Sequence, residues 1–206
     1  MQNYFITGIG TDVGKTLVAA IVVEALQSDY WKPIQAGDLD HSDTHKVKSL
    51  ISNKTTHFFD NAYALATPMS PHAAAEIDEV EIQLSQIKRP NTKNNLVIEG
   101  AGGLLVPLNS EDSVIDLIQP EDLIILVSRH YLGSINHTLL SIEALQQRGF
   151  CKIGIVFSGD EHPTTESIII KKTNVTYLGR IPQLEIVNKK TVADEADKLR
   201  MTLTEF

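Results

Sequence analysis

The sequence has only one cysteine, Cys151, and so it cannot form an intramolecular disulfide. It also has no apolar run of the ~20 residues that are needed to span a bilayer. The longest run near the N-terminus extends only from Leu17 to Val23 and stops at Glu24. The first residues include no basic segment of the kind that opens a signal peptide. We therefore expect no signal peptide and no membrane anchor, and we predict a cytoplasmic protein.

Positive charge is scarce as well. The chain has 18 basic and 26 acidic side chains, which gives a formal net charge of −8, and its lysines gather only in short pairs such as Lys171–Lys172. An acidic surface repels phosphate backbones at long range, so we expect no nucleic acid among its partners. The seven histidines show no paired ligand spacing except His41 and His45, and we therefore do not expect a histidine-based metal site.

The remaining composition is typical of a folded α/β protein. Of the 206 residues, 42% are hydrophobic and 21% are charged, which is enough apolar material to bury a core. No internal repeat or low-complexity tract divides the chain. We therefore predict one domain over residues 1–206.

Short apolar runs bounded by Gly, Pro or Asn alternate with longer segments of helical period, a pattern typical of β-α-β units around a buried parallel sheet. The expected strands are Tyr4–Thr7, Tyr30–Pro33, Leu96–Glu99, Leu123–Ser128, Ile153–Phe157 and Thr176–Gly179. The expected helices run from Lys15 to about Gln27 and over Asp43–Ile51, Asp78–Lys88 and His137–Arg148. Residues Phe58–Pro71 show little periodicity, and we expect an ordered loop there, over the edge where ligands of open α/β sheets bind.

The strongest motif follows the first expected strand. Residues Gly8-Ile-Gly-Thr-Asp-Val-Gly-Lys-Thr16 lead into the most apolar helix, which is the context that a phosphate-binding P-loop requires. Backbone N–H groups of such a turn and the helix N-terminus attract phosphates, while Lys15 is placed to neutralise them and Thr16 to ligate Mg²⁺. Position 9 is Ile9 where the simple motif has glycine, so this is a variant loop in a P-loop NTPase-like, doubly wound, mostly parallel sheet flanked by helices.

A second motif joins a carboxylate to glycines. Glu99 ends the buried run that begins at Leu96, and Gly100, Gly102 and Gly103 follow it. A carboxylate at the carboxyl end of a strand beside the P-loop can share Mg²⁺ with Thr16, and glycines let the backbone approach a ligand. The alternative interpretation is an acidic strand end followed by a hairpin turn.

Two other kinds of P-loop protein can be compared with the sequence. Regulatory GTPases read guanine with Asn-Lys-x-Asp, but Asn53–Thr56 and Asn188–Thr191 both lack the aspartate. Partitioning ATPases carry an additional lysine early in the loop, where this chain has Gly10. These missing motifs argue against both kinds of switch protein. The alternative function that we retain is a P-loop switch ATPase whose nucleotide state controls a partner protein.

The chain closely resembles the ATP-dependent dethiobiotin synthetase family. The segments that carry the resemblance follow the order of the family and cover nearly the whole chain: Gly8–Thr16, Lys32–Gly37, Ser42–Asp43, Thr67–His72, Glu99–Gly103 with Pro107, Leu132–His137, Gly154–Ser158 and Leu178–Pro182. The resemblance implies a homodimeric, Mg²⁺-dependent cyclo-ligase of biotin biosynthesis that converts 7,8-diaminononanoate, CO₂ and ATP to dethiobiotin, ADP and phosphate. An amide-forming relative from cobalamin or nucleotide synthesis is a third candidate, but it normally carries a glutaminase domain that we do not expect in 206 residues.

The resemblance also implies roles for individual residues. Lys15 and Lys32 would be catalytic, and Thr16, Asp43 and Glu99 would bind the metal ion. ATP would be bound by Asp12, Val13, Gly14, Lys15, Thr16, Leu17, Asp43, Glu99, Gly100, Ala101, Gly102, Ser158, Gly159, Pro182, Gln183 and Leu184. The diamine would be bound by Thr11, Lys32, Ala36, Gly133, Ser134, Ile135 and Asn136, of which the last four reach it from the neighbouring subunit.

Two of these positions depart from the family pattern. Ala36 stands where the family usually has a hydroxyl residue, and Ser158 stands where it usually reads adenine with asparagine. The segment from Gly133 precedes an expected helix, so its N–H groups can form an anion-binding nest, with the Asn136 side chain as the helix cap. Such a nest suits the carboxylate at the far end of the diamine.

Overall fold

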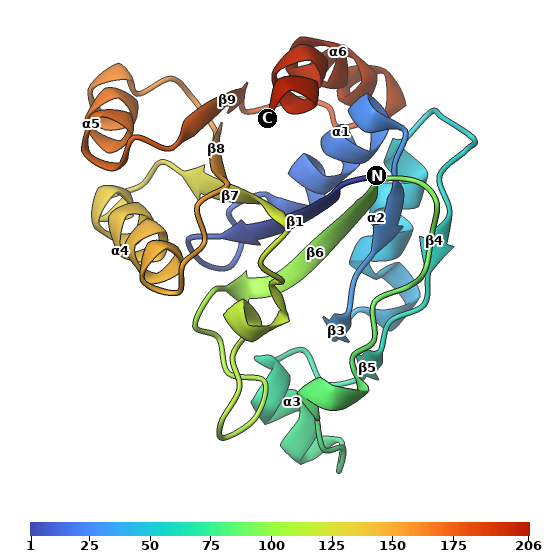
Figure 1. The fold of residues 1–206 in the computed structure, drawn as a ribbon. Coiled ribbons are helices and arrows are strands. Elements are labelled where there is room, and N and C mark those ends of the chain that lie inside the picture. Colours follow the sequence, from blue (N-terminus) through green and yellow to red (C-terminus); the bar gives the residue numbers. More distant parts are fainter.

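Seven parallel strands form the central sheet in the computed structural model, which describes residues 1–206 (Figure 1). The order across the sheet is β4-β2-β6-β1-β7-β8-β9. After β1 the chain forms β2 and β4, returns to place β6 beside β1, and then adds β7, β8 and β9 on the other side of β1. This reversal next to β1 is the switch point at which open α/β sheets bind ligands. The strands are β1 (Asn3–Gly8), β2 (Asp29–Trp31), β4 (Phe58–Phe59), β6 (Leu96–Gly103), β7 (Leu123–Arg129), β8 (Ile153–Ser158) and β9 (Thr176–Ile181).

Helices cover both faces of this sheet (Figure 1). On one face α1 (Lys15–Leu26) packs against α6 (Lys189–Glu205) and α2 (Asp43–Leu50), while α4 (Ser134–Gln147) and α5 (Pro163–Thr173) lie together on the other. α1 lies between the sheet and α6, and its residues from Val18 to Ala25 are all buried. That burial explains why its sequence is apolar all round. The doubly wound parallel fold expected from the sequence is confirmed.

The register of the central strands aligns the ends that form the site. Ile6 of β1 lies opposite Glu99 of β6, and Gly8 lies opposite Gly103. In the next pair Tyr30 of β2 lies opposite Val97 of β6. The P-loop after β1 and the carboxylate on β6 therefore meet at one edge of the sheet.

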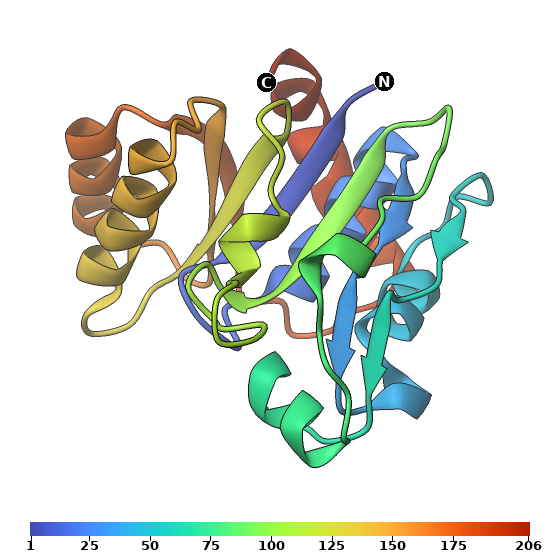
Figure 2. The same cartoon turned by 60° about the horizontal axis from the view of Figure 1, so that its bottom comes forward.

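A small parallel pair extends this edge. β3 (Ile34–Ala36) pairs with β5 (Tyr63–Leu65), and α3 (Pro71–Ile77) follows at the bottom of the view in Figure 2. Gly37 ends β3 with φ +72°, and a Cβ there would lie only 2.5 Å from Cβ of Pro68. Only glycine permits that approach, which brings the loop of residues 67–71 against β3. No helix in the structure combines the length and apolarity that a membrane crossing requires.

The segment between β5 and β6 differs most from the sequence prediction. The expected helix over Asp78–Lys88 is wrong, because α3 ends at Ile77 and only a short 3₁₀ turn (Leu84–Gln86) follows. The Asp78 carboxylate instead accepts hydrogen bonds from the N–H groups of Ala66 and Thr67 and from the Thr67 hydroxyl. Glu79 then adopts a left-handed φ of 55°, which no helix continues.

Other differences concern short or peripheral elements. The expected loop Phe58–Pro71 contains the strands β4 and β5, which are too short to show an alternating pattern. β2 ends at Trp31 rather than at Pro33, and β3 was not expected. The helices α5 and α6 were not predicted from the sequence either.

Candidate active site

The P-loop depends on two of its glycines for its shape. Gly14 is the N-cap of α1 with φ +95°, a conformation that side chains other than glycine rarely adopt. A Cβ on Gly8 would lie 2.6 Å from Cγ2 of Val13, which is buried beneath the loop. The Nζ atom of Lys15 folds back over the loop and donates to the carbonyl oxygen of Gly10 at 2.9 Å.

Burial and then the positive charge of Lys32 lower the pKa of Lys15 to about 8. Lys15 is therefore still largely protonated at neutral pH. Its ammonium group can exchange the Gly10 carbonyl for a phosphate oxygen, which is a stronger, charge-assisted acceptor. The loop thus holds its cation ready at the start of α1.

Glu99 is the centre of the site and is 1% exposed. Its Oε1 atom accepts a hydrogen bond from the Thr16 hydroxyl at 2.9 Å and another from the Lys32 ammonium at 3.1 Å. Its Oε2 atom accepts a hydrogen bond from the Tyr30 hydroxyl at 2.8 Å. A buried carboxylate needs such partners to remain charged, and here they come from α1, β2 and the residue after β2.

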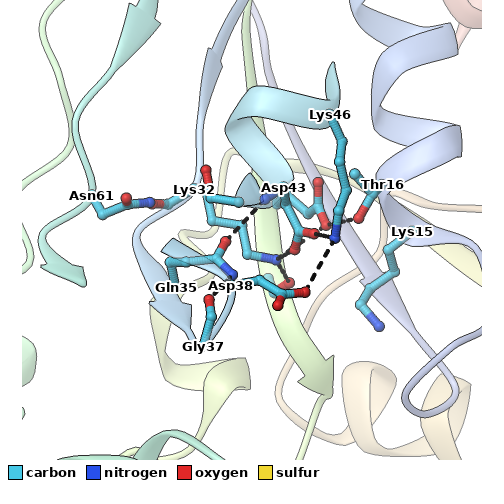
Figure 3. A network of polar contacts seen from close by, with 12 residues as sticks. Lys15, Thr16, Lys32, Gln35, Gly37, Asp38, Asp43, Lys46 and Asn61 are labelled. Carbon is cyan, nitrogen blue, oxygen red and sulfur yellow. Dashed lines mark hydrogen bonds and ion pairs between the residues drawn. The ribbon is translucent and has the colours of Figure 1, made fainter. Parts of the chain in front are cut away.

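Lys32 bridges the two carboxylates of the site. Its Nζ atom lies 2.6 Å from Oδ2 of Asp43 and 3.1 Å from Oε1 of Glu99, and it also donates to the carbonyl oxygen of Gly100 (Figure 3). Burial alone would lower the pKa of Lys32, but the charges of Glu99 and Asp43 outweigh burial and raise it. Lys32 is therefore a permanent buried cation.

Asp43 is the first residue of α2, and Ser42 before it is the N-cap of the helix. The Ser42 hydroxyl accepts the N–H of His45 at 3.4 Å, and Oε1 of Gln35 accepts the N–H of Asp43 at 3.2 Å. One turn later, Nζ of Lys46 lies 3.4 Å from Oδ1 of Asp43 (Figure 3). No role was predicted for Lys46 from the sequence, although its i+3 spacing from Asp43 places the two residues on one helix face.

These groups line a cavity of about 750 Å³. It brings together many of the residues that the sequence singled out: Thr11, Asp12, Gly14, Lys15, Thr16, Leu17, Lys32, Ala36, Asp43, Glu99, Ala101 and Gly102. It also includes residues to which no role was assigned from sequence: Ile34, Gln35, Lys46, Pro68, Met69, Ser70, Pro71 and Val106. The loop against Gly37 thus supplies one wall of the cavity.

The residues expected to bind the base lie outside that cavity. Ser158 is the last residue of β8 and Gly159 follows it, while Pro182, Gln183 and Leu184 follow β9. The Gly159 N–H donates to the carbonyl oxygen of Ile181, which joins the two strand ends. The Ser158 hydroxyl oxygen is 3.0 Å from the place where a Cβ of Gly14 would stand, so this edge adjoins the P-loop.

The start of α4 also lies outside the cavity and differs in detail from the expectation. The helix begins at Ser134 with Gly133 as its N-cap, at φ +103°. Asn136 therefore stands inside the first turn, and the expectation that its side chain caps the helix is wrong. Glycine adopts the left-handed cap conformation without a steric penalty, so the helix starts earlier than the Asn136 signal suggests.

The donor set near Lys32 fits a magnesium ion. Thr16 offers a hydroxyl, and Asp43 and Glu99 offer carboxylates within reach of one ammonium group. The structure has no cluster of three or more His, Cys, Asp or Glu side chains that could hold a metal ion by themselves. Mg²⁺ usually takes one or two carboxylates and completes its coordination with water and phosphate oxygens, so these three residues suffice in chemical type.

A parallel sheet whose central strand leads through a glycine-rich loop into a buried helix, with a buried carboxylate on the neighbouring strand, defines a P-loop nucleotide-binding protein. The family model described as "AAA domain" matches residues 2–191. A relative named ATP-dependent dethiobiotin synthetase BioD, from Christiangramia forsetii, is 65% identical over 100% of this chain and 99% of its own length. A relative of the same name from Cytophaga hutchinsonii is 49% identical over 97% of each chain. The chain belongs to the ATP-dependent dethiobiotin synthetase family, and the resemblance seen in its motifs is confirmed.

Solved structures with the same architecture are more distant in sequence. A ParA family ATPase from Chlorobium tepidum matches with a TM-score of 0.60 at 13% identity, over 99% of this chain and 96% of its own. The MinD cell division protein of Aquifex aeolicus matches with a TM-score of 0.59 at 12% identity, over 97% and 96%. At such identities the likeness concerns the fold alone, and it gives no support to the switch ATPase alternative.

Proposed function

We infer that this protein is an ATP-dependent dethiobiotin synthetase, a ligase of biotin biosynthesis. The observation that carries this conclusion is the 65% identity to a curated relative of that name over the full chain. The reaction joins CO₂ to 7,8-diaminononanoate and closes the cyclic urea, with ATP converted to ADP and phosphate. The cavity offers lysine cations and oxygen ligands for Mg²⁺, which are the groups that this reaction requires.

The reaction requires positive charge where two anions meet. One amine captures CO₂ as a carbamate with loss of a proton, and a carbamate oxygen then attacks the γ-phosphorus of ATP and displaces ADP. The second amine attacks the activated carbonyl carbon and releases phosphate. We propose that Lys15 binds the β- and γ-phosphate oxygens, and that Lys32 contacts the substrate and the transferred phosphate, because fixed cations stabilise charge that develops in a transition state.

The same site would hold Mg²⁺ through Thr16, Asp43 and Glu99. When bound, the ion supplies charge neutralisation at the β- and γ-phosphates. Lys32 contacts both carboxylates in the structure, so it balances their negative charge before the metal ion and nucleotide arrive. Both carboxylates therefore already have a cationic partner at the site where the metal ion would bind.

ATP would contact three parts of the chain. We propose that the loop from Asp12 to Leu17 and the backbone of Gly100–Gly102 bind the phosphates, and that Ser158–Gly159 and Pro182–Leu184 bind the base. The position of Ser158 beside Gly14 supports this arrangement. Thr11 and Ala36 would line the diamine site.

We propose a homodimer in which each cavity is completed by residues Gly133–Asn136 of the second copy. In their own chain these residues lie outside the cavity, and the adjacent surface carries exposed apolar side chains, Leu132, Leu105 and Leu140. Burial of such a patch favours association. Sedimentation is expected to give about twice the 22.7 kDa mass of one chain, and a 22.7 kDa particle at assay concentration would contradict the proposal.

We also propose that residues 1–206 act as one ATP-binding synthetase domain and work in the cytoplasm. A hydrophobic cluster that extends from Tyr4 to Leu203 supports one domain. ATP is an intracellular substrate, and the single cysteine is free, both of which suit a reducing compartment. Separate expression of either half of the sheet is expected to give no stable fold, which proteolysis would reveal.

To test the function, the protein is incubated with ATP and Mg²⁺, and the ADP formed is measured with and without 7,8-diaminononanoate and bicarbonate. We expect ADP to form in a one-to-one ratio with dethiobiotin, and only when both additions are present. A switch ATPase would release ADP at the same rate with or without them. That result would contradict the synthetase assignment.

The same assay with other nucleotides tests the role of Ser158. A serine hydroxyl is one rotatable group, whereas an asparagine amide offers a donor and an acceptor that together match adenine. We therefore expect CTP or GTP to support turnover within about tenfold to a hundredfold of ATP, or ~1.4–2.8 kcal/mol of discrimination. Strict rejection of both would mean that the backbone near Pro182–Leu184 reads the base.

A further inference from the structure

Tyr30 lies under the site and has had no role so far. It stands in the middle of β2, is 0% exposed, and is the largest of the fully buried side chains. Because Tyr30 lies opposite Val97 and strand side chains alternate between faces, Tyr30 points to the same face of the sheet as Glu99, two residues after Val97. The aromatic ring therefore lies on the side of the sheet that carries the acidic centre.

The two oxygens of Glu99 have different partners. Oε1 faces the cavity side, where it accepts hydrogen bonds from Thr16 and Lys32. Oε2 faces the interior, and the Tyr30 hydroxyl is the side-chain donor to it, at 2.8 Å. The carboxylate is thus held at Oε2 by the Tyr30 hydroxyl, and Oε1 is the oxygen that contacts the cavity residues Thr16 and Lys32.

Tyr30 is also fixed in place by packing. Its ring is held by contact with Phe58, at 5.8 Å between ring centroids, so the position of the hydroxyl is set by packing as well as by its hydrogen bond.

We propose that Tyr30 is a positioning residue of the metal site, whose hydroxyl orients Glu99 so that Oε1 faces Thr16 and the bound Mg²⁺. This inference rests on the proposed role of Glu99 as a metal ligand. Partners behind a ligand restrict its rotation and tune its basicity, and their loss typically lowers metal affinity or activity by about 10- to 100-fold. Tyr30 has the burial and the contact that such a partner requires.

The test is Tyr30→Phe, which removes the hydroxyl and keeps the ring against Phe58. We expect the affinity for Mn²⁺ in the presence of ADP, measured from the paramagnetic resonance signal of free Mn²⁺, to fall about 10- to 100-fold. The Mg²⁺ concentration for half-maximal turnover should rise by a similar factor, while kcat at saturating Mg²⁺ changes much less. A purely structural role would not produce this difference between metal dependence and kcat.

Tyr4→Phe is the matched control. Tyr4 is also buried, and its hydroxyl donates to the carbonyl oxygen of Leu203 at 3.4 Å, on the C-terminal helix. Its loss removes an equivalent group away from the metal site, so Mn²⁺ affinity should stay at the wild-type value. Equal losses of Mn²⁺ affinity in both variants would overturn the proposal, because they would indicate general destabilisation.

Glu99→Gln separates this inference from the assignment on which it rests. If Glu99→Gln weakens Mn²⁺ binding and Tyr30→Phe binds Mn²⁺ like the wild type, Tyr30 does not position the ligand and the inference is wrong. If Glu99→Gln itself binds Mn²⁺ like the wild type, the metal-ligand role of Glu99 is wrong and the inference falls with it. The expected result is a large loss in Glu99→Gln and a smaller, clear loss in Tyr30→Phe.

Discussion

Lys32→Ala is expected to lower kcat by at least about a hundredfold at saturating ATP and Mg²⁺. Lys32 is 4% exposed and pairs with two carboxylates at the edge of the cavity, so its truncation removes a buried, positioned cation from the site. Loss of one preorganised electrostatic donor from an active site typically removes about 3–4 kcal/mol of transition-state stabilisation. Lys32→Arg should recover little activity, because a planar guanidinium does not replace a compact ammonium.

Lys46→Ala is the matched control for Lys32. Lys46 lines the same cavity and also pairs with Asp43, at 3.4 Å, but its side chain is 48% exposed. Exposed ion pairs contribute little because water screens them, so this variant should retain most of its kcat. A Lys32→Ala enzyme with nearly wild-type turnover, measured by dethiobiotin formation, would show that Lys32 does not contact the reacting groups.

Glu99→Gln should lower turnover about as strongly as Lys32→Ala does, while the protein remains folded. The amide has the size of the carboxylate, but it lacks the negative charge and replaces one acceptor oxygen by a donor. Thr16, Tyr30 and Lys32 all donate to Glu99, so one of them would face another donor. A bound metal ion contributes several kcal/mol of charge stabilisation, and weaker binding of that ion should reduce kcat at least about a hundredfold.

Glu24→Gln provides a comparison for buried carboxylates in general. Glu24 lies on α1 away from the cavity, and Ser52 and Asn53 donate hydrogen bonds to its carboxylate. Burial raises the pKa of Glu24, but these hydrogen bonds outweigh burial and lower the pKa below its usual value. Its amide variant should lower the melting temperature and leave kcat unchanged. Wild-type turnover of Glu99→Gln at saturating Mg²⁺ would contradict the metal assignment.

Local pattern was sufficient for much of the fold. The apolar runs at Tyr4, Leu123 and Ile153 are strands within one residue of their expected bounds, because buried parallel strands need continuous apolar sequence. The run at Leu96 also begins a strand, but β6 continues to Gly103, four residues beyond its expected end at Glu99. Asp78 shows where this approach failed. Its carboxylate binds the backbone of residues 66 and 67 rather than starting a helix, and no local pattern contains that contact.

The sequence by itself determined the P-loop from Gly8 to Thr16, the parallel sheet behind it and the family of the protein, because each is indicated by short motifs and apolar runs whose residues are neighbours along the chain. Only the tertiary structure decided what surrounds Glu99. Thr16 is 83 residues from Glu99 and Tyr30 is 69 residues from it, and they meet because β6 is paired with β1 on one side and with β2 on the other. A shift of one residue in the register of β2 would turn Tyr30 to the opposite face of the sheet.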